Sequence, residues 1–217
     1  MENGYGLPEQ LHARRLRAPM KVLANAANVL AAFGSASVTG FINDPDIPTD
    51  TPGFDPYAAA TTAQQLVDWV SDAVLQIETT NIVEGESDLG AMVLIAPRSL
   101  CIRMRQLYID GTSDTAEATL LKNFPEIRAI LPTSYLTARE LEARGVKAGG
   151  TNENRFILYP FDDMALERHE SIVVPLPPEY RDGRFHLPFV QAYSQTIIKQ
   201  PLFMRYVDFP YNAATDG

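Results

Sequence analysis

The stretch Leu23–Pro45, "LANAANVLAAFGSASVTGFINDP", decides the fold, because it is a long helix former with nothing reactive at its end. Its first half is rich in alanine, and within the stretch no charged residue occurs before Asp44. Apolar residues upstream recur at spacings near three, four and seven, so the sequence predicts one helix from Leu7 to Phe33, about 40 Å long. Gly34 is its expected C-terminal cap, and Pro19 is expected to bend it. Small residues on several faces indicate a rod that neighbouring elements cross closely.

The length, composition and net charge of the chain restrict the class of protein. A chain of 217 residues with 46% apolar residues can form one large domain or two small ones. Its net charge of -9 argues against broad binding to phosphate backbones. Polar and small residues dilute the longest uncharged stretch too far for a membrane span, so no transmembrane segment is predicted. No secretory signal is recognised at the N-terminus, and we therefore expect a cytoplasmic origin.

Two segments follow the long helix. Four prolines in residues 43–57 exclude a helix or central strand, so a surface connection is expected there. A second helix then begins after Thr62, where Gln65 is placed for a capping box. Residues 81–90 are expected to form a loop. The buried side of the second helix is predicted to consist of Leu66, Trp69, Val70, Ala73, Val74 and Ile77.

The remaining pattern predicts an α+β fold. Strands and helices alternate in a way that indicates a mixed sheet covered by helices. Thr137 and Glu140 are expected to form a capping box, and Gly145 to end that helix. After Ser171 the chain becomes extended and proline-rich, and these segments are expected to leave the first sheet and pair elsewhere. The expected strands are 91–97, 127–132 and 155–160, the expected helices 97–108, 115–123 and 137–145, and the extended segments 171–180, 184–199 and 201–211.

Titratable residues suggest few sites. Glu167 and His169, with Asp162 or Asp163, could hold a metal ion of a small hydrolase, although a solvated loop rim is the favoured interpretation. The other histidines, His12 and His186, lie far away in the sequence. We therefore predict no catalytic, cofactor-binding or metal-binding residue and no cofactor.

Other candidate motifs are incomplete. Asp44, Asp46 and Asp50 are spaced as in a calcium loop, but the required glycine and glutamate are missing. Ser87 lies between glycines without the spacing of a nucleophile elbow. Cys101 is the only cysteine and is interpreted as a small core residue. The aromatic residues near the C-terminus could stack on bases, but core or subunit contacts are favoured; they are Phe203, Tyr206, Phe209 and Tyr211.

Taken in order, several stretches resemble the major capsid protein of tailed bacteriophages and prophages, which has the Hong Kong 97-like fold. "RLRAPMKVLANAANVLAAFGSASVTGFINDPDIP" resembles its spine helix and the exit from that helix. "MVLIAPRSLCIRM" and "DGTSDTAEATLLKNFPEIRAILPTSYL" resemble strands and helices of its axial domain. "NRFILYPFDDMALERHESIVVPLPPEY" and "KQPLFMRYVDFPYNAATDG" resemble the closing part of the chain.

The resemblance implies three regions. Residues 1–42 are expected to form the spine helix and part of the peripheral domain, residues 43–170 the mixed-sheet axial domain, and residues 171–217 strands that return to the peripheral domain. The sequence begins almost at the spine helix, so the N-terminal arm and the E-loop of the family are expected to be lacking.

The resemblance also implies a function. It is self-assembly into pentamers and hexamers of an icosahedral shell around DNA, with other capsid or scaffolding proteins as further partners and no membrane. The expected location is the virion capsid, after synthesis in the cytoplasm of a bacterial host. An encapsulin-like compartment shell remains an alternative, as does, further behind, the metal-dependent hydrolase.

Overall fold

The structure is a computed structural model, and it forms two compact units. It describes residues 9–35, 38–51, 53–84, 91–161, 166–169, 171–172, 174–177, 179–182, 184–186, 188–194 and 196–211. The first unit, here the helix-ribbon unit, comprises Met1–Phe41 and Arg168–Thr196. The second, here the sheet unit, comprises Ile42–Glu167 and Ile197–Gly217. No helix in the described ranges is both long enough and apolar enough to cross a membrane.

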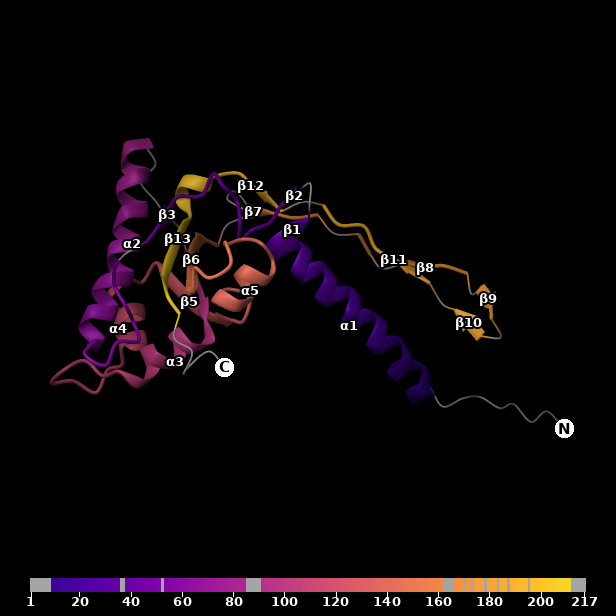
Figure 1. Ribbon diagram of the computed structural model, residues 1–217, viewed down its shortest axis with the longest axis horizontal. Helices are drawn as coiled ribbons and strands as arrows, with labels where there is room; N and C mark the ends of the chain where they lie inside the picture. The colour runs from indigo at the N-terminus through magenta and orange to yellow at the C-terminus, as the bar shows by residue number, and fades with distance from the viewer. Residues whose placement is uncertain are drawn as a thin grey trace. The chain divides into compact units, whose positions relative to one another are not determined.

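The helix-ribbon unit contains the expected long helix, α1, which spans Glu9–Phe33 (Figure 1). Its 25 residues correspond to about 37 Å. Gly34 follows with φ 71°, the left-handed conformation of a C-terminal glycine cap, as predicted. The hairpin of β1 (Gly34–Ser35) and β2 (Val38–Thr39) then turns the chain back toward the end of the helix.

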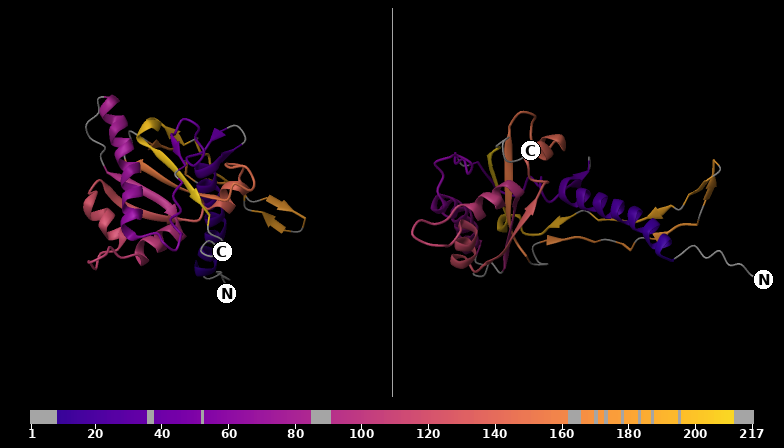
Figure 2. Two further views of the ribbon diagram at one scale, coloured as in Figure 1. Left: turned by 60° about the vertical axis from the view of Figure 1, so that its left-hand side comes forward. Right: turned by 90° about the horizontal axis from the view of Figure 1, so that it is seen from below.

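The rest of the helix-ribbon unit is a two-stranded antiparallel ribbon (Figure 2). Of the extended segments that the sequence predicts after residue 171, the part up to residue 190 pairs here, but only in ladders of two or three residues. Prolines such as Pro175 and Pro188 donate no backbone hydrogen bond and thereby keep the ladders short. The ladders join β8 (Val174–Pro175) to β11 (Phe189–Val190) and β9 (Glu179–Arg181) to β10 (Arg184–His186).

The sheet unit is built on a five-stranded mixed sheet in the order β3-β13-β6-β4-β5. β13 is parallel to β3 and antiparallel to β6, whereas β4 is antiparallel to β6 and parallel to β5. A separate short ladder joins β7 to β12. The strands are β3 (Thr49–Asp50), β4 (Met92–Pro97), β5 (Ile127–Thr133), β6 (Glu153–Pro160), β7 (Leu166–Glu167), β12 (Ile197–Ile198) and β13 (Arg205–Pro210).

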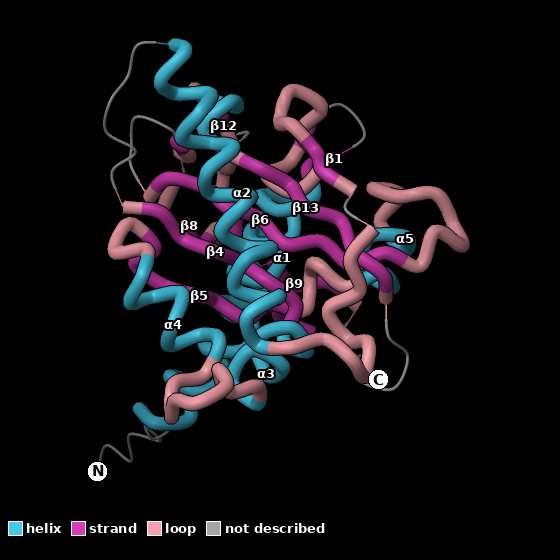
Figure 3. The backbone as a smooth tube through the Cα atoms, turned by 90° about the vertical axis from the view of Figure 1, so that its left-hand side faces the viewer, coloured by secondary structure: helices cyan, strands magenta, loops and turns pink. Residues whose placement is uncertain are grey.

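Helices cover the sheet. α2, α3 and α4 bury one face of it in a single apolar cluster (Figure 3). α5 lies on the other side of the sheet from α2 (Figure 1). A short 3-10 turn, Pro201–Phe203, precedes β13. The helices are α2 (Ala63–Glu84), α3 (Arg98–Gln106), α4 (Ala116–Asn123) and α5 (Ala138–Ala143).

The interior of the sheet unit matches the pattern predicted for the second helix. All six residues of the expected stripe are buried, and the Trp69 ring lies 5.0 Å from Phe156 and 5.4 Å from Phe209 between ring centroids. The capping box is present as well, because the Thr62 backbone N–H donates to Gln65 Oε1 and the Gln65 N–H donates to Thr62 Oγ1.

The prediction for the final strand is wrong. β13 was expected to leave the first sheet, but it lies within that sheet between β3 and β6. The prolines do not interrupt the strand, because Pro201 lies at the start of the preceding turn and Pro210 is the last residue of the strand. Its four middle residues are buried on both faces, with Val207 and Phe209 in the apolar cluster and Tyr206 on the other side. Residues 197–211 therefore belong to the sheet unit, and the boundaries of the units fall at 41/42, 167/168 and 196/197.

Three local expectations also need correction. The segment of residues 43–57 contains no helix or central strand among its described residues, as predicted, but it contributes the edge strand β3 and buries Ile47 and so is more than a surface connection. Residues 81–84 continue α2 instead of starting a loop, and residues 85–90 lie outside the described residues. The Thr137 side chain makes no capping bond, since its hydroxyl donates to the Ser134 carbonyl. Gly145 has φ 70° just after α5, as expected of the glycine that ends it.

Candidate functional site

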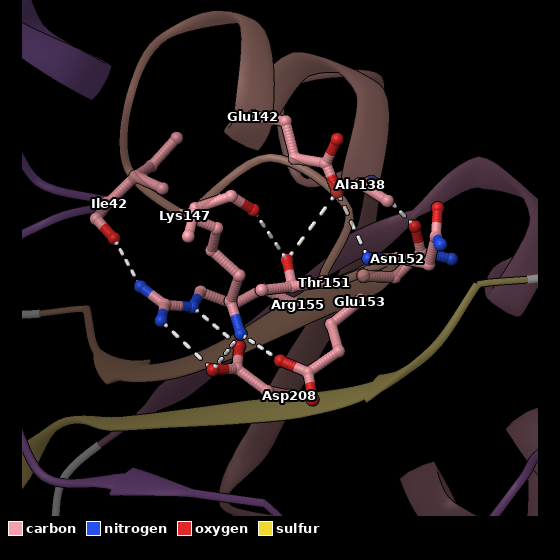
Figure 4. A network of polar contacts seen from close by, with 11 residues as sticks. Ile42, Ala138, Glu142, Lys147, Thr151, Asn152, Glu153, Arg155 and Asp208 are labelled. Atoms are coloured by element: carbon pink, nitrogen blue, oxygen red, sulfur yellow. Dashed lines mark hydrogen bonds and ion pairs between the residues drawn. The ribbon is translucent and has the colours of Figure 1, made fainter.

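A buried pair of opposite charges joins the neighbouring strands β6 and β13 of the sheet unit (Figure 4). It lies on the face opposite the apolar cluster, because Arg155 and Asp208 alternate with Phe156, Val207 and Phe209 of that cluster. Arg155 on β6 and Asp208 on β13 are directly opposite each other in the ladder. Arg155 Nε donates to Asp208 Oδ1 at 2.7 Å, and Nη2 donates to Oδ2 at 3.1 Å. The side chains are 8% and 3% exposed. This two-pronged geometry is the strongest form of a carboxylate–guanidinium contact.

The pair extends into a network of four charges. Lys147, in the loop after α5, places Nζ 2.6 Å from Asp208 Oδ2 and also pairs with Glu153. Arg155 Nη1 donates to the Ile42 carbonyl at 2.6 Å, and its guanidinium lies 4.3 Å from the centre of the Tyr206 ring. Two cations and two carboxylates balance, so the buried charges compensate one another.

Another carboxylate, that of Glu142, organises the loop between α5 and β6. Glu142 Oε1 accepts hydrogen bonds from the Asn152 backbone N–H at 3.0 Å and from Thr151 Oγ1 at 3.5 Å. Asn152 has φ 48°, a left-handed conformation that asparagine tolerates better than most residues. Backbone N–H groups of Asn152 and Gly150 hold the pKa of Glu142 below its ordinary value.

The polar groups of these networks have partners within the protein. Every polar group of Arg155 that is described above already has a protein partner, and Asp208 accepts from two cations. Burial, with smaller effects of the Asp44 and Asp208 carboxylates, raises the pKa of Tyr206, whose hydroxyl accepts a hydrogen bond from the Asp44 backbone N–H. Within the described ranges, no group of three or more His, Cys, Asp or Glu side chains could hold a metal ion. The arrangement is that of a structural clamp.

The metal-site hypothesis gains no support. Glu167 lies on β7 and its carboxylate is 2.6 Å from Lys199 Nζ. The His169 backbone N–H donates to Ser194 Oγ at 2.7 Å. Asp162 and Asp163 lie outside the described residues.

The other singled-out acids and the cysteine have structural surroundings. Asp44 Oδ1 accepts from the Asp46 N–H at 2.9 Å, which closes a local turn, and Asp50 lies 3.5 Å from Arg205. Cys101 is 1% exposed, as expected of a core residue, and burial raises the pKa of its thiol to about 11. Ser87 lies outside the described residues. Of the C-terminal aromatic residues, Tyr206 and Phe209 are buried in the sheet unit.

Sequence reasoning missed the Arg155–Asp208 clamp. The signal available was weak: Arg155 in "RFILYP" and Asp208 in "RYVDFP" each lie beside apolar residues, but Arg205 is a second charge in the latter stretch. A charge at a strand position whose neighbours are buried usually needs a partner of opposite sign. The Arg155–Asp208 pair depends on the pairing of β13 with β6, which the sequence alone did not predict.

The ribbon of the helix-ribbon unit carries apolar side chains that are exposed. Val174 and Val190 are partners in the ladder and therefore lie on one face, 45% and 51% exposed. Ile172 and Leu176 lie two residues before and after Val174, at positions that share its face in an extended strand, and are 82% and 40% exposed. We call these four residues the ribbon face.

Comparison with solved structures identifies the fold. A chain from the capsid of Myoviridae phage XM1 superposes with a TM-score of 0.71 and 15% identity over 92% of this chain. The fold of this chain is therefore that of a phage capsid protein. A virus-like particle from Pyrococcus furiosus superposes less closely, with a TM-score of 0.50 and 12% identity over 76% of this chain.

The resemblance noted in the sequence is thus confirmed for a phage capsid fold with an α+β class and a mixed sheet, whereas the Hong Kong 97-like type stays a prediction. The chain spans 65% of the phage capsid chain and 57% of the virus-like-particle chain. No protein-family model matches the sequence, and no curated protein matches it.

Proposed function

We propose that this chain is a structural subunit that self-assembles into an icosahedral shell of the Hong Kong 97-like type. In this proposal α1 is the spine helix, the sheet unit is the axial domain, and the ribbon belongs to the peripheral domain. The fold likeness to a phage capsid supports the proposal, in which the role of the chain is structural and not enzymatic.

The ribbon face is the observation that carries the proposal. A two-stranded ribbon has no interior of its own and is marginal in water. Four exposed apolar residues on it add a surface that is costly to leave hydrated. Exposed apolar residues also occur on α1, where Met20 is 45% and Val22 66% exposed. Contacts with further copies of the chain would remove such surface from water.

The assembly is expected to be closed and symmetric. Heterologous contacts, in which different surfaces of neighbouring subunits meet, generate rings such as pentamers and hexamers. Other capsid or scaffolding proteins are proposed as further partners, DNA as the enclosed material, and the virion as the location after synthesis in the host cytoplasm. A net charge of -9 is compatible with a wall that does not bind the DNA it encloses.

The test compares two double variants. In Val174→Lys/Val190→Lys, charges on the ribbon face should abolish particles and rings in electron micrographs and sedimentation at high protein concentration. Leu75→Lys/Leu121→Lys places charges on α2 and α4, where both leucines are exposed, and should assemble like the unmodified chain. Unmodified chain that stays monomeric at every salt and protein concentration would overturn the proposal, as would a ribbon variant that assembles normally.

An encapsulin-like compartment shell is the second candidate. The observation in its favour is the likeness to a virus-like particle, although that likeness is weaker than the one to the phage capsid. Particles purified from cells distinguish the two. Enclosed DNA supports the phage capsid, and an enclosed enzyme in the absence of DNA supports the compartment.

A further inference from the structure

The two units differ in the sign of their net charge. The helix-ribbon unit contains seven Lys and Arg against five Asp and Glu, a net charge of +2. The sheet unit contains 11 Lys and Arg against 22 Asp and Glu, a net charge of -11. Charged surfaces of opposite sign attract each other over about a Debye length, which is ~10 Å at 0.1 M salt. Units of opposite sign on different copies of the chain therefore attract each other.

The positive charge of the helix-ribbon unit is concentrated on α1. Four of its seven cations lie within the first half of this helix, where Glu9 is the only acidic residue. Each of the four lacks a carboxylate three or four residues away, the spacing at which side chains pair along a helix. Three of the polar residues of one helix face, at positions 21, 25 and 28, are exposed. We call this the basic face of α1, and by the helical spacing its positions are Arg14, Arg17, Lys21, Asn25 and Asn28.

The negative charge of the sheet unit begins before its first long helix. The stretch Val22–Pro97 contains ten Asp and Glu and neither Lys nor Arg. Asp55, in the connection, and Asp68, in the first turns of α2, are exposed. They belong to one region, because their neighbours Phe54 and Trp69 pack with ring centroids 5.1 Å apart. We call Asp55 and Asp68 the acidic region of the sheet unit.

We propose that the basic face of α1 in one copy of the chain binds the acidic region of the sheet unit in a second copy. The contact joins two different surfaces, so it can repeat from copy to copy and close a ring. The inference rests on the proposed self-assembly and names charged surfaces that direct it. Such charges mainly raise the rate of association and select the partner surface, and apolar contacts such as those of the ribbon face add affinity.

A phosphate backbone is another polyanion that a basic helix can bind. The second copy is the favoured partner because the chain as a whole, with a net charge of -9, repels a phosphate backbone. Association of copies instead places a unit of charge +2 against a unit of charge -11.

The test uses two charge-swapped variants of the full chain. Arg17→Glu/Lys21→Glu makes the basic face acidic, and Gln64→Lys/Asp68→Lys makes the acidic region basic. Each variant alone should need about tenfold more protein than the unmodified chain to form rings or particles, because like charges then meet. An equal mixture of the two should associate like the unmodified chain. Sedimentation velocity and electron microscopy at about 0.1 M salt measure association, and circular dichroism checks that each variant is folded.

Arg98→Glu/Arg139→Glu is the matched control. It changes the net charge as much as Arg17→Glu/Lys21→Glu does, but at exposed positions of the sheet unit, and should associate at least as well as the unmodified chain. An equal loss in this control, or a mixture that does not recover, would overturn the inference and leave the proposed shell standing.

The remaining outcomes separate the inference from the proposed function. Rings that the mixture restores, without closed shells, would support the inference and contradict the shell. Unmodified chain that is monomeric under every condition would overturn both. If Arg17→Glu/Lys21→Glu assembles normally but loses binding to double-stranded DNA, the basic face binds nucleic acid and the inference is wrong.

Discussion

Arg155 and Asp208 face each other across β6 and β13 and are joined by two parallel hydrogen bonds of 2.7 and 3.1 Å. Because both side chains are nearly inaccessible to water, replacement of one partner leaves the other charge buried without compensation. Asp208→Asn should therefore lower the free energy of unfolding by about 3 to 5 kcal/mol. Urea unfolding followed by Trp69 fluorescence measures this loss.

A matched ion pair on the same strand provides the control. Arg205, also on β13, pairs with Asp50 at 3.5 Å, and the Asp50 side chain is 33% exposed. Asp50→Asn should lower the free energy of unfolding by less than Asp208→Asn does, because water already solvates the Asp50 carboxylate, although the Arg205 side chain is only 12% exposed. Equal losses in the two variants would show that burial does not determine the strength of the Arg155–Asp208 clamp.

The helices and three of the sheet strands were predictable because their signals are local. A helix such as α2 is predicted by the spacing of its apolar residues and by the Thr62–Gln65 capping box, and both signals involve residues close together in the sequence. β4 is similarly recognisable as a continuous apolar run. Each of these patterns needs no knowledge of distant residues.

The sheet order and the clamp depend on contacts across the sequence. β13 pairs with β6, which is separated from it by the whole ribbon segment, and nothing local specifies that partner. The prolines around β13 led to the prediction that this segment leaves the sheet. In the structure it stays in the sheet, where Val207 and Phe209 are buried in the apolar cluster that includes α2. The Thr137 hydroxyl likewise could either cap α5 or bond to Ser134, and sequence spacing does not distinguish these two choices.

Gly40 is required by a close backbone approach at the end of α1. A Cβ at this position would lie 2.3 Å from the Gly34 nitrogen and 2.4 Å from the Ala32 oxygen. Backbone atoms cannot yield as the end of a flexible side chain can, so Gly40→Ala should cost about 1 to 3 kcal/mol or more. Thermal unfolding followed by circular dichroism measures the loss.

Gly53→Ala is the corresponding control, because a Cβ there meets no atom within 4 Å. It should leave stability unchanged or raise it by up to about 1 kcal/mol, through the reduced freedom of the unfolded chain. A Gly40→Ala variant as stable as Gly53→Ala would contradict the close approach.

Cys101 gives the protein a pH-dependent stability in alkali. Burial raises the pKa of its thiol from 9.0 to about 11 in the folded chain. Since the unfolded chain releases the proton first, the contribution is complete below pH 9 and is lost as the pH rises toward 11. The loss should be on the order of 1 to 2 kcal/mol.

Comparison with Cys101→Ala isolates this contribution from other groups that titrate in alkali, such as Tyr206, whose pKa is also raised by burial. Unfolding free energies of both proteins are measured by urea denaturation at a series of pH values from 8 upward. The unmodified chain should lose stability more steeply than the variant. Parallel curves would mean that the folded thiol titrates as in the unfolded chain.

Glu142 should give the α5–β6 loop the opposite dependence, with order lost in acid. Its pKa is held below the ordinary value of 4.5 by backbone N–H groups, so the stabilisation is present above that value. It is lost as the pH falls through the lower, folded-state pKa. The Asn152 amide, which donates to Glu142 Oε1, should report this in NMR spectra through a shift whose midpoint lies below pH 4.5.

Glu142→Gln should remove that titration and speed hydrogen exchange of the Asn152 amide, because a neutral amide oxygen accepts more weakly than a carboxylate. Glu140→Gln is the matched variant on the same helix, where the side chain pairs only loosely with Arg144 at 3.8 Å. Asn152 should be unaffected by that change. A midpoint at or above pH 4.5, or equal exchange rates in the two variants, would show that the loop is held by the turn of the backbone and not by the Glu142 carboxylate.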